Sequence, residues 1–217
     1  MDIVIPSAAS IEVFAVAATL LLLTPGPAVL YIVARSVEQG RIAGLASVFG
    51  ITTGTLVHVL ASTLGLSALL ASSALAFALV KYAGAGYLIY IGLRRILKRT
   101  DAPVSPQNLP RRSLGKLYRD GFIVNVLNPK TALFFLAFLP QFVDPARGAV
   151  PMQIAFLGLL FTLMGLTSDG LYALVAGTAG LWVKRRSRYL EWERYVTGSV
   201  FIGLGVTAAL AGGRRLT

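Results

Sequence analysis

Proline follows a polar residue at two places inside long apolar stretches of this chain, giving two short motifs: Thr24, Pro25, Gly26 and Pro27, and Asn128, Pro129 and Lys130. Thr and Asn are good N-cap residues and proline is favoured at the first helical position, so each motif predicts the start of a half-helix. The backbone N–H groups of such a start attract anions, and two facing starts would hold a carboxylate. The alternative is a pair of proline kinks whose backbone groups are satisfied by neighbouring helices.

Other polar side chains in the apolar stretches are further candidates for chemistry. Lys130 places a cation in the first turn of the second half-helix, where it would bind a substrate carboxylate or pair with Asp169. Asp169 and His58 are candidates for carrying a proton or receiving a substrate ammonium group, although a lone histidine in an apolar helix often serves packing alone. Asn125, one turn before the second motif, suits either exposed backbone carbonyls or the substrate.

The composition indicates where these residues lie. Of 217 residues, 56% are apolar and 13% charged, with a mean hydropathy of +0.74, whereas a soluble domain has about 25% charged residues. The absence of Cys and the single His leave too few ligands for a selective metal site, and no cofactor is expected. The net charge of +11 comes from basic residues in the gaps between apolar runs, so nucleic-acid binding is not expected either.

Apolar runs of about 20 residues cross a bilayer as helices. We expect six spans, at residues 11–34, 42–64, 74–93, 121–143, part of 151–183, and 195–213. The runs lack the strict alternation of strands, so the predicted class is an all-α polytopic membrane protein with helices 1 and 4 broken. Fifteen Lys and Arg residues fall after the odd-numbered spans and three fall elsewhere outside the spans. By the positive-inside rule those loops are cytoplasmic and both termini are external.

The chain is predicted to form one transmembrane domain, residues 1–217, built from two related halves at about 1–100 and 111–217. A proline-rich linker at about 101–110 joins them. Thr24 matches Asn128 in the two halves, and the pair Lys81 and Tyr82 matches Arg194 and Tyr195. Three spans in each half make the second half inverted, an arrangement typical of transporters whose halves move around a site near the midplane.

Three segments resemble the lysine exporter (LysE) superfamily, particularly its RhtB branch of amino-acid efflux proteins: TPGPAVLYIVARSVEQGRIAGLASVFGITTG, KYAGAGYLIYIGLR and GFIVNVLNPKTALFFLAFLPQFVDP. The resemblance covers nearly the whole chain. It implies a six-span bacterial inner-membrane exporter of amino acids or related metabolites that uses the proton gradient. The family motifs fall on Pro25, Gly26 and Pro27 and on Asn128, Pro129 and Lys130, whereas Thr55 and Thr131 depart from the usual residues.

The function expected from the sequence is therefore export of a small zwitterionic amino acid by a secondary transporter. Its expected partners are the substrate, protons and the lipid bilayer, with a homodimer possible. Efflux of another small solute or a metal cation is the alternative. An intramembrane enzyme would need paired aspartates, an HExxH helix or a serine with a positioned base, none of which the spans contain.

Overall fold

The computed structural model describes residues 4–72 and 111–179, together with single positions between 79 and 97 and between 195 and 206. The helices in these parts are α1 (Ala8–Leu23), α2 (Pro27–Gln39), α3 (Arg41–Ser72), α5 (Leu114–Val126), α6 (Pro129–Leu133) and α7 (Val150–Ala179). After α6 the chain continues as a π-helix at Phe134–Phe138 and as 3-10 turns at Leu139–Phe142 and Pro145–Arg147. No strand occurs in the described ranges. The predicted all-α class is confirmed.

The two predicted breaks are present. The axes of α1 and α2 differ by 50°, and those of α5 and the segment Pro129–Phe142 differ by 44°. Each pair is long and apolar enough to cross a membrane only when its two members are taken together, whereas α3 and α7 each suffice alone. The predicted spans at 74–93 and 195–213, and the linker at 101–110, lie wholly or mostly outside the described residues.

The sequence prediction placed the first helix start incorrectly. Thr24 is the C-cap of α1, and Gly26 is the N-cap of α2 with Pro27 at the first position. A residue before proline is disfavoured in the α-helical region, and Gly26 is accordingly extended, with φ −132° and ψ −174°. The new helix therefore begins at Pro27 rather than at Pro25. At the second break Asn128 is the N-cap and Pro129 the first residue, as predicted.

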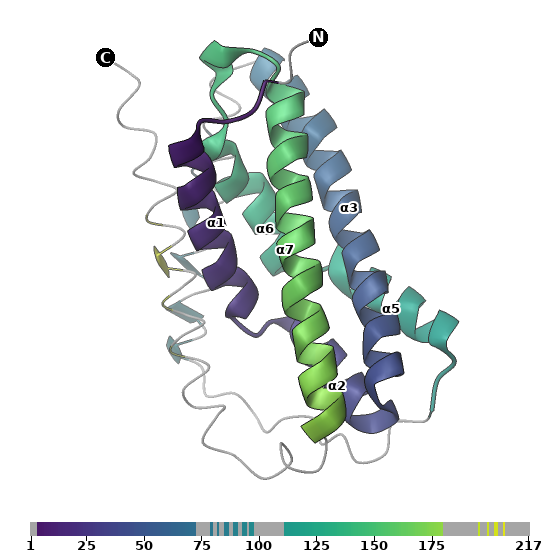
Figure 1. The fold of residues 1–217 in the computed structure, drawn as a ribbon. Coiled ribbons are helices and arrows are strands. Elements are labelled where there is room, and N and C mark those ends of the chain that lie inside the picture. Colours follow the sequence, from purple (N-terminus) through teal and green to yellow (C-terminus); the bar gives the residue numbers. More distant parts are fainter. Residues whose placement is uncertain are drawn as a thin grey trace.

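The described helices of the two predicted halves run in opposite directions (Figure 1). The pair α1 and α2 descends in that view while α5 and α6 ascend, and likewise α3 ascends while α7 descends. This arrangement agrees with the inverted repeat predicted from the span count. α3 extends at least to Ser72, beyond the predicted end of the second span, and α7 is described as far as Ala179.

Packing between the halves depends on backbone contact between α3 and α5. A Cβ atom added to Gly50 would lie 2.0 Å from the carbonyl oxygen of Tyr118, and one added to Gly121 would lie 2.7 Å from that of Ser47. Only glycine permits this approach, which is how small residues bring membrane helices together. A separate cluster of buried phenylalanines packs α1 and α7 against the segment after α6.

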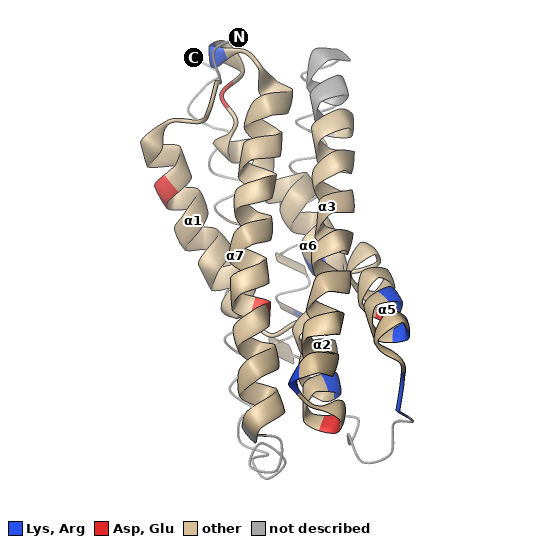
Figure 2. Cartoon of the chain, turned by 45° about the vertical axis from the view of Figure 1, so that its right-hand side comes forward, with Lys and Arg blue, Asp and Glu red and all other residues tan. Residues whose placement is uncertain are grey.

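Most of the Lys and Arg residues in the described part of the chain lie toward one end of the bundle (Figure 2). Where α2 ends and where α3 and α5 begin lie Arg35, Arg41, Arg111, Arg112, Lys116 and Arg119. We call this the charged end, and the opposite end, near Arg147, the far end. Among the described residues the Lys and Arg asymmetry thus coincides with the side that the sequence assigns to the cytoplasm.

Candidate functional site

A small cavity of about 40 Å³ lies between the two helix breaks. At about 10 to 15 Å³ of such volume per water, it has room for a few water molecules. Its polar lining includes residues from both halves: Thr52, Thr55, Asn125, Asn128, Lys130, Thr131, Thr162 and Asp169. Gly26, Ala28 and Val29 contribute the start of α2 to the wall. Five residues predicted as site residues therefore meet here, namely Gly26, Asn125, Asn128, Lys130 and Asp169.

The end of α1 is neutralised by side chains from the other half. The Lys130 ammonium donates a hydrogen bond to the carbonyl oxygen of Thr24, and the Tyr172 hydroxyl donates to that of Leu23 at 3.0 Å. The Thr24 hydroxyl itself donates to Leu20 at 2.7 Å. Carbonyl groups at a helix C-terminus carry partial negative charge, so a cation at this position is favourable.

The two helix starts differ in what they offer an anion. α2 has 13 residues, and no side chain caps its N-terminus at Gly26. α6 has five residues, and the side-chain oxygen of Asn128 accepts a hydrogen bond from the Lys130 backbone N–H at 3.1 Å. The start of α2 is therefore more open to an anion, because no side chain caps its N–H groups.

Asn125 is fully used by its neighbours. Its amide nitrogen donates to the carbonyl of Ile51 and to the hydroxyl of Thr55, both at 2.8 Å. Its amide oxygen accepts from Thr131 at 3.1 Å and from Asn128 at 3.4 Å. A side-chain amide offers two donors and a two-lone-pair acceptor, so all of its capacity is spent. Asn125 thus connects α3 to the second break, and its polar atoms are occupied in this structure.

His58 does not line the cavity but contacts Asn125, which does. Its Nε2 atom is 3.0 Å from the carbonyl oxygen of Asn125, and its ring stacks on Phe135 at 5.9 Å between centroids. The same carbonyl also accepts from the backbone N–H of Asn128 at 3.0 Å, so His58 makes an additional contact at the end of α5.

Asp169 brings a carboxylate to the cavity from the middle of α7. The residue is 7% exposed and lines the same cavity as Lys130. The two side chains interact electrostatically. Burying opposite charges in one cavity wall is costly unless they compensate each other or a ligand does so. The site thus presents a positive group from the start of α6 and a negative group from α7, two elements of the second half, in one cavity wall.

Hydroxyl groups of the wall were missed as site residues by the sequence analysis. Thr162 donates to Gly158 at 2.8 Å, Thr55 to Ile51 at 3.2 Å and Thr131 to Asn125. Because each hydroxyl hydrogen is already used, the oxygens of Thr131 and Thr162 remain acceptors, which suits an ammonium group. Threonines are frequent in apolar helices, so nothing in their local sequence distinguishes these from packing residues. Among the described residues no three His, Asp or Glu side chains come together as metal ligands do.

Comparison with known proteins identifies a family of membrane translocators. The family model described as "LysE type translocator" matches residues 19–212. The chain is 30% identical to a homoserine/homoserine lactone efflux protein of Salmonella typhimurium, covering 89% of this chain and 92% of that one. It is also 27% identical to the uncharacterized membrane protein YrhP of Bacillus subtilis, covering 89% and 95%. No solved structure matches.

Proposed function

Because this chain belongs to the LysE type translocator family, we propose that it exports a small zwitterionic amino acid from the cytoplasm across the bacterial inner membrane. Family membership makes it a transporter and not an enzyme. The naming of a relative as a homoserine and homoserine lactone efflux protein supports a substrate of that size and charge. The observation that carries the proposal is the cavity between the two breaks, with Lys130 and Asp169 in its wall.

Each end of a zwitterion has a complementary group in this cavity. The substrate carboxylate binds the uncapped start of α2 together with the Lys130 ammonium. The substrate ammonium binds Asp169 and the free oxygen lone pairs of Thr131 and Thr162. A bound amino acid therefore compensates both buried charges at once. This compensation is why a zwitterion is favoured over a metal cation, which would leave Lys130 facing like charge.

The cavity in this structure has too little space for an amino acid. Export then requires the halves to rearrange so that the cavity opens to one side at a time, as inverted repeats allow. Proton coupling is assigned to Asp169, because a carboxylate that faces the substrate ammonium can exchange it for a proton when the substrate leaves outward. In each cycle Asp169 is compensated either by substrate or by a proton.

The test is a flux panel in proteoliposomes. Purified protein is reconstituted, loaded with unlabelled homoserine, and assayed for counterflow uptake of radiolabelled homoserine, threonine, lysine and leucine. A second series measures export with and without an imposed pH gradient. Uptake of at least one amino acid above protein-free vesicles, stimulated by the gradient in the export direction, supports the proposal. Uptake of none of them, or of divalent cations alone, overturns it.

A further inference from the structure

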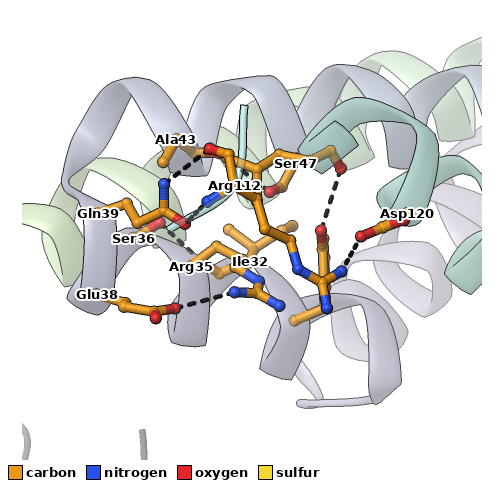
Figure 3. Close-up of polar contacts among 11 residues, drawn as sticks. Ile32, Arg35, Ser36, Glu38, Gln39, Ala43, Ser47, Arg112 and Asp120 are labelled. Atoms are coloured by element: carbon orange, nitrogen blue, oxygen red, sulfur yellow. Dashed lines mark hydrogen bonds and ion pairs between the residues drawn. The ribbon is translucent and has the colours of Figure 1, made fainter. Parts of the chain in front are cut away.

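The charged end of the bundle contains polar contacts that tie the two halves together (Figure 3). Gln39, the last residue of α2, donates from its side-chain amide to the backbone carbonyl of Arg112 at 3.0 Å. The same amide accepts from the backbone N–H of Arg112 at 2.9 Å. Both bonds go to the main chain just before α5, so they do not depend on which side chain occupies position 112.

A second contact lies two turns further along α2 toward the cavity. The hydroxyl of Tyr31 donates to the backbone carbonyl of Leu117, on α5, at 3.1 Å. Arg112 is also held by an ion pair with Asp120 of α5. α2 is therefore attached to the first turns of α5 at two levels, by hydrogen bonds that water can replace.

The charged groups around this contact are buried and incompletely paired. Arg35 and Glu38 form an ion pair at 3.0 Å with side chains 5% and 11% exposed. Even so, Arg35 Nε, Glu38 Oε1 and Arg112 Nε are buried without hydrogen-bond partners in the described structure. Such atoms are unfavourable until water reaches them. Separation of α2 from the start of α5 would let water into this region, where it can replace the broken hydrogen bonds and reduce the cost of opening.

The other walls of the cavity are held by close backbone and aromatic packing rather than by polar contacts. α5 is fixed to α3 by backbone contact at Gly50 and Gly121, which hydration cannot replace. Toward the far end, Phe161 of the cavity wall stacks on Phe134 at 4.4 Å, within the phenylalanine cluster. The contact between α2 and α5 is thus the polar boundary between the cavity and the charged end.

From these contacts we propose that Gln39 and Tyr31 are positioning residues of a gate at the charged end, which opens when α2 parts from the start of α5. The inference rests on the proposed transport function. Gln39 touches neither cavity nor substrate and acts by holding the main chain before α5. When its bonds break, the cavity becomes accessible from the charged end while the phenylalanine cluster keeps the far end closed.

The absence of cysteine allows single thiols to be introduced as reporters. Thr52→Cys places a thiol in the cavity wall, and the exposed positions Arg111→Cys and Arg147→Cys mark the charged and far ends. Labelling by a membrane-impermeant maleimide is followed in intact cells and in inside-out vesicles. Adding Gln39→Ala should raise the labelling rate of Thr52→Cys about fivefold or more, the shift expected for losing one to two hydrogen bonds. The increase should appear only from the side that labels Arg111→Cys.

Controls separate gating from general loosening. Tyr31→Phe removes one hydroxyl and should raise the labelling rate of Thr52→Cys from the same side by a smaller factor. This variant replaces Gln39→Ala in the test if Gln39→Ala does not fold. Gln141→Ala breaks a bond of 2.8 Å to Ala137 inside its own segment and should change nothing. Unchanged labelling in both gate variants, or an equal increase from both sides, overturns the gate. Labelling needs no substrate, so a failure of the export assay leaves this result interpretable.

Discussion

The side-chain ammonium of Lys130 donates a hydrogen bond to the backbone carbonyl of Thr24, so a residue of the second half satisfies the broken helix of the first. Its aliphatic chain passes Gly26, where an added Cβ would lie 2.9 Å from the Lys130 Cδ atom. Lys130 therefore sits between the negative end of α1 and the positive start of α2. In the proposed binding mode a substrate carboxylate competes with the Thr24 carbonyl for this ammonium, so that substrate affinity depends on the geometry of the break.

Gly26→Ala should disturb this geometry without changing any charge. The new methyl group pushes the Lys130 side chain away from the Thr24 carbonyl and the start of α2. We expect substrate affinity to fall about tenfold, or about 1.4 kcal/mol, as measured by titration of the purified protein. Gly165→Ala is the matched control, because it lines the same cavity but its Cβ would meet Leu22 at an ordinary 3.5 Å. Equal losses in the two variants would contradict a specific role for the space at Gly26.

Gly50→Ala tests the close contact of α3 with α5. Its methyl group would need the space of the Tyr118 carbonyl, so the helices must separate. We expect a loss of about 1 to 3 kcal/mol in the free energy of unfolding, the usual cost of overpacking, seen as a lower Tm in detergent. Gly65→Ala, with nothing within 4 Å of the added atom, should be neutral or stabilising by up to about 1 kcal/mol. An unchanged Tm for Gly50→Ala would show that the helices can move apart freely.

The positions of the breaks and the class of fold were predictable because they depend on local chemistry. Proline in an apolar run and the cap residue Asn128 act within a few residues of chain, and spans follow from hydropathy alone. The role of Thr24 was mispredicted because the restriction that Pro27 places on Gly26 outweighs the capping preference of threonine. The contacts of Lys130 with Thr24 and of Asn125 with Ile51 join residues far apart in sequence. Such pairings depend on how the helices pack, which no local pattern specifies.

Topology is testable independently of the site. The excess of Lys and Arg in the loops after the odd-numbered spans predicts that a reporter fused after Thr217 lies outside the cytoplasm. A reporter inserted in the linker at 101–110 should lie inside. The paired fusions, assayed as alkaline phosphatase and fluorescent protein, give opposite signals if six spans are present. Cytoplasmic activity after Thr217 would mean an odd number of spans or the reverse orientation.

Asp169→Asn should separate proton coupling from substrate binding. Removing the titratable group abolishes export driven by a pH gradient, while counterflow exchange continues because exchange need not cycle the proton. Glu12→Gln, which makes the same chemical change at an exposed position of α1, should leave both activities intact. Gradient-driven export at the parental rate in Asp169→Asn would make Asp169 structural and leave His58 as the candidate proton carrier.

Lys130→Gln tests the carboxylate site directly. If Lys130 and the start of α2 hold the substrate carboxylate, losing the charge should weaken binding by about 1.5 to 3 kcal/mol, the range for a charge-assisted hydrogen bond. That corresponds to roughly 10- to 150-fold in Kd. Lys116→Gln removes a charge from an exposed position of α5 and should bind as the parent does.

An amino-acid amide distinguishes the carboxylate mechanism from a change in cavity shape. Lacking the carboxylate, the amide should bind the parent protein weakly and lose little further affinity in Lys130→Gln. Equal losses for acid and amide would mean that Lys130 acts through the Thr24 carbonyl or through Asp169, because those contacts do not involve the substrate carboxylate. A folded Lys130→Gln protein that binds the free acid as tightly as the parent would place the carboxylate elsewhere and reduce the two breaks to proline kinks.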